Sequence, residues 1–319
     1  MATIGELLNA GTARLRASGS ESARLDTELL LGWAVGIDRV GVLAHPEAPV
    51  GADAAAAFEG ALSRREKGEP VAYIRGFKEF HGLAFSVDAR ALIPRPETEL
   101  MVDEAERDVA WRLTAAPRPA GTPNVRVLDV GTGSGAVAIA LAARLRKRRM
   151  LPEVDVVAAD VSPDALSLAK ENAVAHAVAD AVTFAEADLV PAGEATGAMD
   201  EASARAVAAP FDVILANLPY IPSGDVDRLP VAASFEPRLA LDGGPDGLDV
   251  VRRLVGRLPD ALSAEGSAYL EIGWDQGDAV KAIVAALPGT WNCEIEADLS
   301  GRPRLACIAR GPAPRFGGR

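Results

Sequence analysis

The segment from residue 125 to residue 135, Val-Arg-Val-Leu-Asp-Val-Gly-Thr-Gly-Ser-Gly, constrains the fold more than any other part of the chain. A β-branched apolar run leads to Asp129, a loop with glycine at every second position follows, and an alanine-rich helical pattern begins at Ala136. Glycine lets the backbone turn sharply and lets a ligand approach where a Cβ atom would block it. The helix that follows presents free N–H groups at its first turn. The segment therefore predicts a strand, a tight turn and a helix that bind a nucleotide-type cofactor.

The glycine spacing narrows the choice of cofactor. It is Gly-x-Gly-x-Gly, whereas dinucleotide sites have Gly-x-Gly-x-x-Gly and P-loops continue with Lys-Ser/Thr. The next acidic strand end is Asp160, 25 residues beyond Gly135, and a carboxylate there can accept both hydroxyls of a ribose. A glycine loop with a ribose-binding acid suits S-adenosylmethionine (AdoMet) as well as NAD.

A second segment favours AdoMet over NAD. Residues 211–216 read as a buried strand that runs into Asn217-Leu218-Pro219-Tyr220. This tetrapeptide resembles the Asn-Pro-Pro-Tyr signature of methyltransferases that act on planar amino or amide nitrogens, with leucine in place of the first proline. Together, the two segments predict an AdoMet-dependent methyltransferase.

Composition argues against several other classes of protein. The net charge of the 319 residues is −12, and an acidic chain is a poor general binder of nucleic acid because phosphate affinity comes from lysine and arginine. The densest basic run, residues 144–149, is interpreted as a solvated helix end. Cys293 and Cys307 lack the spacing of metal ligands, so we expect reduced buried thiols and no metal.

Features of targeting segments are not visible either. The first residues carry an early acid, Glu6, and no apolar core of a signal peptide. No apolar run reaches the 18 residues or so that a membrane span needs. We therefore expect a cytoplasmic protein with no membrane partner.

The order of the predicted elements indicates the architecture. Helical periodicity over residues 2–66 predicts a small bundle, and residues 77–80 and 84–87 predict a β-hairpin around His81-Gly82-Leu83. Strands and helices alternate from residue 125 onward, which predicts an α/β fold with a doubly wound, mostly parallel sheet. Ligands bind such sheets at the carboxyl ends of the strands. The expected strands are 125–130, 154–160, 181–187, 211–216, 267–272, 291–297 and 304–310, and the expected helices after the bundle are 136–147, one from Ser162, 246–262 and 275–287. Residues 192–209 are expected to form a mobile insertion.

These motifs, in this order, resemble the HemK/PrmC-type release factor glutamine methyltransferases over residues 20–310. Particular matches are Glu69-Pro-Val-Ala-Tyr-Ile-Arg-Gly76, Leu92-Ile-Pro-Arg-Pro-Glu-Thr-Glu-Leu100, the glycine loop, Asn217-Leu-Pro-Tyr-Ile221, Glu271-Ile-Gly273 with Gln276, and Asp298-Leu-Ser-Gly-Arg302. The resemblance implies a helical N-terminal domain (1–75), a β-hairpin linker (76–94), a class I methyltransferase domain (95–312) and a disordered tail (313–319).

The resemblance also implies a reaction and a site. A methyl group would pass from AdoMet to the side-chain amide of the glutamine in the Gly-Gly-Gln motif of class I peptide chain release factors. The implied cofactor-binding residues are Gly131, Thr132, Gly133, Ser134, Gly135, Asp160, Asp188, Leu189 and Asn217, and the implied catalytic residues are Asn217, Leu218, Pro219 and Tyr220. Release factors would be the partners, with no direct contact to nucleic acid, and we expect a monomer.

Two positions depart from the family pattern. Leu189 stands where many relatives have an aromatic residue against the adenine, so stacking should be weaker. Leu218 replaces a proline, but its expected contribution is a backbone carbonyl, which any residue supplies. We interpret Asn217 and this carbonyl as the groups that bind the two hydrogens of the substrate amide.

Three questions stay open at this level. Glu97 and Glu99 could be ordinary acids at a helix start or have a role beside the site. The Asn-x-Pro-Tyr element also fits a methyltransferase acting on the amino group of adenine in DNA or RNA. The departures at Leu189 and Leu218 also fit a partner protein that binds AdoMet without catalysis.

Overall fold

The computed structural model describes residues 1–115, 121–190 and 208–311, and the chain divides into two compact units. The first unit comprises Met1–Phe77, Val87–Ala89 and Leu229–Glu236, and the second comprises Lys78–Ser86, Arg90–Arg228 and Pro237–Arg319. The domain boundaries given above from the sequence stay a prediction. Among the described residues, no helix combines the length and the apolar character that crossing a membrane requires.

The first unit is a helical bundle, as the periodicity predicts. Its helices are α1 (Ile4–Ala17), α2 (Ala23–Val35), α3 (Arg39–Ala44), α4 (Ala52–Glu66) and α5 (Val71–Arg75). Helix α2 ends at Gly36 in the left-handed conformation, which glycine adopts without steric cost. Its buried face is formed by Leu30 and Leu31, whereas Leu25 and Trp33 are 41% and 40% exposed. Helices α3 and α5 are too short for periodicity to predict.

The predicted hairpin is formed by β1 (Phe77–Phe80) and β2 (Leu83–Ser86). Strand β1 has the predicted bounds, and β2 begins and ends one residue before the predicted strand 84–87. Its turn is held by the start of α6 (Glu99–Thr114): the His81 N–H donates to the Glu99 carboxylate at 2.9 Å, and the His81 ring lies 3.1 Å from the Glu99 carbonyl oxygen. Glu99 therefore has a structural role in this turn.

Seven strands form one sheet in the described part of the second unit. They are β3 (Val125–Val130), β4 (Val154–Asp160), β5 (Val182–Glu186), β6 (Phe211–Ala216), β7 (Leu262–Glu271), β8 (Trp291–Ala297) and β9 (Pro303–Arg310). Their order is β5-β4-β3-β6-β7-β9-β8. Neighbours from β5 to β7 pair in parallel, and β9 runs antiparallel to both β7 and β8. This is the doubly wound, mostly parallel sheet that the sequence predicts.

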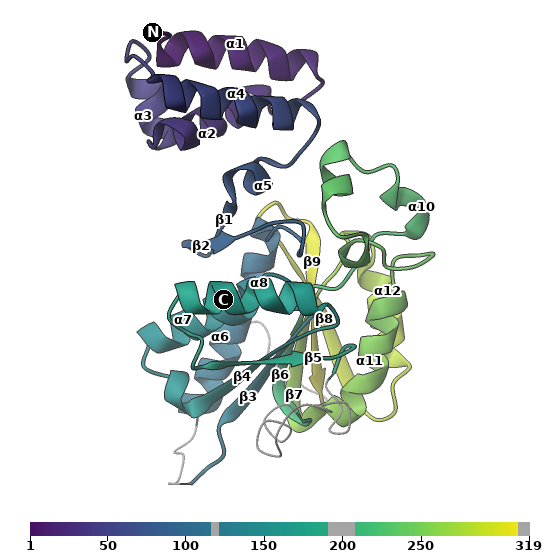
Figure 1. Cartoon of the computed structure of the whole chain (residues 1–319). Coiled ribbons are helices and arrows are strands. Elements are labelled where there is room, and N and C mark those ends of the chain that lie inside the picture. Colours follow the sequence, from purple (N-terminus) through teal and green to yellow (C-terminus); the bar gives the residue numbers. More distant parts are fainter. Residues whose placement is uncertain (116–120, 191–207, 312–319) are drawn as a thin grey trace. The chain divides into compact units, whose positions relative to one another are not determined.

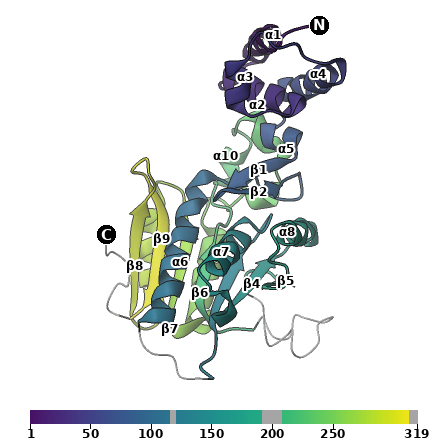
Figure 2. The same ribbon diagram turned by 90° about the vertical axis from the view of Figure 1, so that its left-hand side faces the viewer.

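Helices cover both faces of this sheet (Figures 1 and 2). Alternate residues of each central strand point to opposite faces: Val127 and Val213 pack under α6 and α7 (Ala136–Lys147), and Leu128 and Ile214 pack under α11 (Asp249–Ala261) and α12 (Gly277–Ala285). Helix α8 (Pro163–Ala175) adds Ala173 to the first core. Burial on both faces explains why these strands read as continuous apolar runs.

Several predicted bounds differ from the structure. Strand β7 begins at Leu262 instead of residue 267, α11 begins at Asp249, and α12 is shorter at both ends than predicted. The stretch between the predicted strand 211–216 and the predicted helix 246–262 contains helix α10 (Ser223–Val226) and two 3-10 helices, Val231–Phe235 and Arg238–Ala240. Most of the predicted insertion 192–209 and the tail after residue 311 lie outside the described residues.

The chain leaves β3 toward β4 on one side and later continues from β6 on the other side. In open α/β sheets the crevice at this reversal binds ligands, at the carboxyl ends of the strands. The glycine loop follows β3 and Asn217 follows β6, so both lie at this switch point.

One buried side chain joins the hairpin to the glycine loop. Asn172 of α8 is fully buried; its Oδ1 accepts from the Ser86 N–H at 2.8 Å. Its Nδ2 donates to the carbonyls of Ser86 and Ser134 at 3.1 and 2.9 Å. These bonds give backbone groups of the hairpin and of the glycine loop a common buried partner.

Replacing Asn172 by leucine keeps the volume and removes all three bonds. We expect Asn172→Leu to lower the free energy of unfolding by about 2–5 kcal/mol, because three backbone groups lose their partner in a buried site. Urea denaturation followed by circular dichroism measures this. Lys170→Ala, an exposed change on the same helix, is the control and should stay within about 0.5 kcal/mol of the wild type. If Asn172→Leu lowered the free energy of unfolding by less than about 1 kcal/mol, the three hydrogen bonds of Asn172 would not have the stabilising role assigned to them.

Candidate active site

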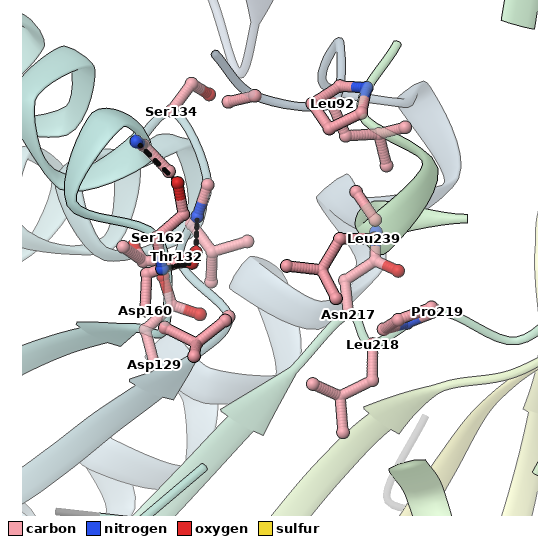
Figure 3. A pocket seen from close by; sticks show the side chains of 18 of the residues that line it. Leu92, Asp129, Thr132, Ser134, Asp160, Ser162, Asn217, Leu218, Pro219 and Leu239 are labelled. Atoms are coloured by element: carbon pink, nitrogen blue, oxygen red, sulfur yellow. Dashed lines mark hydrogen bonds between the residues drawn. The ribbon is translucent and has the colours of Figure 1, made fainter. Parts of the chain in front are cut away.

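A cavity lies at the carboxyl ends of β3, β4 and β6 (Figure 3). Thr132 and Asp160 stand on one side of it, and Asn217 and Pro219 on the other. Of the site residues predicted from the sequence, those that line it are Gly131, Thr132, Gly133, Ser134, Asp160, Asp188, Leu189, Asn217, Leu218 and Pro219. Gly135 and Tyr220 are not among its lining residues. The fold thus brings together ten of the twelve predicted positions.

The three glycines of the loop, Gly131, Gly133 and Gly135, all have positive φ. Gly135 and Gly133 differ in what a side chain at each position would meet. A Cβ atom on Gly135 would lie 2.7 Å from Cδ1 of Ile139, so this glycine is needed for packing behind the loop. A Cβ atom on Gly133 would have no neighbour closer than 3.8 Å. That open space belongs to the cavity, so Gly133 leaves room for a ligand against the backbone.

Asp129, the last acid of β3, organises the loop from beneath. Its carboxylate accepts from the Thr132 hydroxyl at 2.6 Å and from the Ala138 N–H at 3.2 Å. Burial raises the pKa of Asp129 to about 6, although both hydrogen bonds oppose this shift. The sequence marks Asp129 as the strand end, and the structure shows that its side chain fixes the turn that follows.

Asp160 holds the same loop from the neighbouring strand. One carboxylate oxygen accepts from the Gly133 N–H at 2.8 Å, and the other accepts from the Ser162 N–H at 2.9 Å. The side chain also lines the cavity, and the two oxygens of a carboxylate offer about four lone pairs in all. Burial raises the pKa of Asp160, against the effect of these backbone donors. The carboxylate can therefore still accept hydrogen bonds from a ligand's hydroxyl groups.

Asp188 and Leu189 border the cavity beyond β5. Arg253 pairs with the Asp188 carboxylate, and Arg257 donates to the Asp188 carbonyl at 2.7 Å. Leu189 has a φ of +71°, a conformation that is rare for a side chain of this kind. Leu189 is buried in the core beneath α11, so at this position the site presents an aliphatic surface.

The Asn217–Tyr220 segment is held from behind by two side chains that sequence reasoning did not select. Asn217 Nδ2 donates to the Thr98 hydroxyl at 3.0 Å, and the Thr98 hydroxyl donates to the Glu271 carboxylate at 2.5 Å. The Tyr220 hydroxyl donates to the other oxygen of Glu271 at 3.3 Å. Burial, with the charge of Glu271, raises the pKa of Tyr220 to about 12. Tyr220 therefore supports the loop and does not form the cavity wall.

The backbone of this segment is fixed as well. Gln276 donates to the Tyr220 carbonyl at 2.9 Å and accepts from the Gly273 N–H at 2.8 Å. Leu218 is buried, and its Cδ2 would lie 3.3 Å from a Cβ atom on Gly131. The leucine side chain thus packs beneath the glycine loop, which a proline ring would do with fewer atoms.

Thr98 and Glu271 could have been found only in part from the sequence. Both lie inside segments that carry the family resemblance. In the first segment, however, the flanking acids Glu97 and Glu99 attract attention because of their charge. Neither acid lines the cavity, whereas Thr98 and Arg95 do.

Known protein families and curated proteins match most of this chain. A model described as "PrmC N-terminal domain" matches residues 6–76, and one described as "Methyltransferase domain" matches residues 122–243. A release factor glutamine methyltransferase from Geobacter sulfurreducens is 38% identical over 255 residues, which are 79% of this chain and 78% of that protein. The chain belongs to the release factor glutamine methyltransferase family.

One further relative matches over nearly the full length of the chain. The Deinococcus radiodurans protein is 36% identical over 307 residues, covering 96% of this chain and 98% of that protein. A solved protein-(glutamine-N5) methyltransferase from Alicyclobacillus acidocaldarius is 27% identical, with a TM-score of 0.39 over 72% of this chain and 100% of that chain. The identity to these curated relatives confirms the family resemblance, and the matched methyltransferase domain with its mostly parallel sheet confirms the class I methyltransferase fold predicted from the sequence.

As a member of this family, the protein is a methyltransferase that uses AdoMet as its methyl donor. The cavity fits that molecule: Gly133 leaves the space that a Cβ atom would fill, and Asp160 offers a buried carboxylate to hydroxyl groups. The amino-terminal end of α7, where Ala136 and Val137 line the cavity, adds backbone donors. When bound, AdoMet supplies an electrophilic methyl group on a sulfonium.

The open space above Gly133 can be tested by filling it. We expect Gly133→Ala to weaken AdoMet binding at least about 10-fold, because the new methyl group occupies ligand space and the left-handed backbone disfavours alanine. Isothermal titration calorimetry measures the dissociation constant. Gly60→Ala on α4, where a Cβ atom meets nothing within 4 Å, is the control and should bind AdoMet as the wild type does. Unchanged affinity in Gly133→Ala would remove Gly133 from the proposed AdoMet contact.

The raised pKa of Asp129 predicts that the stability of the folded protein depends on pH. The folded protein raises its pKa from 3.8 to about 6, so the folded state binds the proton more tightly than the unfolded state. The associated stability is present below about pH 4 and is lost as the pH rises through 6, by about 3 kcal/mol. We expect urea denaturation at pH 4 to 7 to show this loss in the wild type relative to Asp129→Asn. Parallel pH profiles for the two proteins would contradict the assignment.

Proposed function

We propose that this protein transfers a methyl group from AdoMet to the side-chain amide nitrogen of the glutamine in the Gly-Gly-Gln motif of class I peptide chain release factors. The observation that supports it best is the position of Asn217. Asn217 follows the last residue of β6 at the switch point of the sheet, lines the cavity beside the glycine loop, and donates to the buried hydroxyl of Thr98.

An amide nitrogen is a weak nucleophile because its lone pair is delocalised, so the site must orient it. Asn217 Oδ1 and the Leu218 carbonyl are the two acceptors that we assign to the two hydrogens of the substrate amide. They direct the nitrogen toward the methyl group and stabilise the positive charge that develops on it. Pro219 forms the apolar wall next to them. The methylated nitrogen is then acidic enough to lose its extra proton to solvent.

The same proposal assigns the AdoMet contacts. Gly131 to Ser134 hold the methionine part, Asp160 accepts from the ribose hydroxyls, and Asp188 and Leu189 lie against the adenine. Since Leu189 is aliphatic, the adenine contact is apolar and lacks aromatic stacking. We further propose a monomer that acts on the free release factor in the cytoplasm and makes no direct contact with nucleic acid, in line with its net charge of −12.

Incubating the purified protein with AdoMet and an unmodified class I release factor tests the proposal. We expect mass spectrometry to find one added methyl group, on the glutamine of the Gly-Gly-Gln peptide. A release factor with asparagine in place of that glutamine is the control and should stay unmodified. No methyl group on the factor, from a sample that binds AdoMet, would overturn the substrate assignment, and methylated adenine in DNA or RNA would replace it with the nucleic-acid alternative.

Asn217 should contribute to the rate more than to binding of AdoMet. We expect Asn217→Ala to lower kcat about 10²–10³-fold, corresponding to about 3–4 kcal/mol of transition-state stabilisation, with AdoMet affinity within a few-fold of the wild type. Steady-state kinetics with the release factor and calorimetry with AdoMet measure the two effects. Asn124→Ala, just before the amino end of β3, is the control. Near-full turnover by Asn217→Ala would rule out this role.

A further inference from the structure

We infer that Thr98 and Glu271 are positioning residues that set which end of the Asn217 amide faces the substrate, and that they thereby make the site selective for a carboxamide over a carboxylate. The inference deepens the proposed function and rests on it for the identity of the substrate. It is based on the chain of hydrogen bonds from Asn217 through Thr98 to Glu271, which connects segments far apart in the sequence.

The hydrogen bonds that join Asn217, Thr98 and Glu271 are sequestered from water. Thr98 is 4% exposed and Glu271 is 2% exposed, so neither can exchange its partner for solvent without a cost. Thr98 lies just before α6 and Glu271 is the last residue of β7, while Asn217 follows β6. Three elements of the second unit therefore meet at the Thr98 hydroxyl. A contact that serves only packing would not require polar atoms at this buried point.

The number of protons on each group determines which group donates and which accepts in this series of hydrogen bonds. A threonine hydroxyl has one proton, and here it is donated to the Glu271 carboxylate, which has none to offer. The Thr98 oxygen can then only accept, so its neighbour must be the Nδ2 end of Asn217. The Oδ1 end is then the one left to accept a hydrogen bond from the substrate. A flipped Asn217 amide would place two acceptors against each other at Thr98.

Glu271 is the last acceptor in this series of hydrogen bonds, and each of its two carboxylate oxygens accepts one of them. Thr98 donates to one and the Tyr220 hydroxyl donates to the other. Burial raises the pKa of Glu271, and these two donors together with the charge of Arg304 oppose that shift. The same carboxylate thus anchors both ends of the Asn217–Tyr220 segment.

The orientation has a consequence for substrate choice. With Oδ1 of Asn217 and the Leu218 carbonyl both facing the substrate, the site offers two acceptors, which match the two N–H groups of a carboxamide. A glutamate side chain would present two acceptors to these acceptors and is rejected. If the Asn217 amide were free to flip, it would offer a donor, and the penalty against glutamate would shrink.

The test compares Thr98→Val, which keeps the shape and removes the hydroxyl, with Thr98→Ser, which keeps the hydroxyl. The substrate is a class I release factor, and the competitor is the same factor with glutamate in its Gly-Gly-Gln motif. All other contacts are common to the two factors, so the ratio of their dissociation constants reports the end group alone. The matched control is Thr27→Val in α2, which removes another buried hydroxyl, one that donates to the Ala23 carbonyl of its own helix.

We expect Thr98→Val to lower kcat about 10-fold or more and to reduce the preference for the glutamine factor over the glutamate factor about 5-fold or more. Thr98→Ser should restore both quantities to within a few-fold, and Thr27→Val should leave both unchanged. A Thr98→Val enzyme that keeps wild-type kcat and wild-type rejection of the glutamate factor would overturn the inference while the proposed function stands. Equal losses of kcat in Thr98→Val and Thr98→Ser, without a change in preference, would also overturn it.

A second measurement does not depend on the substrate. In the ¹⁵N-labelled protein with AdoMet, the Asn217 side-chain amide signals are identified by their absence in Asn217→Ala. We expect one Nδ2 proton to be protected from exchange with solvent in the wild type and in Thr98→Ser, and to lose that protection in Thr98→Val and Glu271→Ala. If the wild type shows this pattern but does not methylate a release factor, the proposed substrate fails and the positioning role stands. Equal protection in all of these proteins would overturn the inference.

Discussion

A loop made largely of glycine has few side chains with which to hold its own shape, and the rest of the site depends on how neighbouring residues hold it. Asp129 binds the Thr132 hydroxyl and the backbone of α7, Asp160 binds the Gly133 N–H, and Asn172 binds the Ser134 carbonyl. Each of these polar side chains is buried, and each bond would cost free energy to break without a replacement. The loop can therefore stay open above Gly133 while its ends are fixed from below and from the side.

The opposite wall of the cavity uses the same device with a different set of residues. Asn217 and Tyr220 are both linked to Glu271, one through Thr98 and one directly, and Gln276 binds the carbonyl of Tyr220. A substrate amide must be oriented to react, and a rigid pair of acceptors does this better than a mobile one. The two walls together explain how the site can direct a weak nucleophile.

The two departures from the family pattern become understandable in this setting. Leu218 lines the cavity and buries its side chain beneath Gly131, and the backbone carbonyl that we assign to the substrate amide does not depend on a proline ring. Leu189 keeps an apolar surface at its position, and the hydrogen bond from Arg257 to the preceding carbonyl supports its unusual backbone. Both changes preserve the shape of the site, which fits a catalytic protein better than a partner that only binds AdoMet.

The central strands β3, β4 and β6 and the helix α7 have the bounds that the sequence predicts, because an apolar run buried on both faces ends where burial ends. The start of β7 was not predictable in this way, since its residues 263–265 lack full burial and carry no apolar signal. The roles of Glu97 and Glu99 could not be decided either, because a carboxylate at a helix start looks the same in the sequence whether it faces a ligand or a turn.

The amino-acid sequence by itself therefore determined the fold class, the family, the glycine loop and the residues at the ends of the central strands, all of which depend on local order along the chain. Only the tertiary structure decided that Tyr220 supports the wall from behind, that Gly135 serves packing, and that Thr98 joins Asn217 to Glu271. Thr98 is separated from Asn217 by 119 positions and from Glu271 by 173. Hydrogen bonds across such separations exist only because β6 and β7 end where α6 begins, and that meeting is a property of the folded chain.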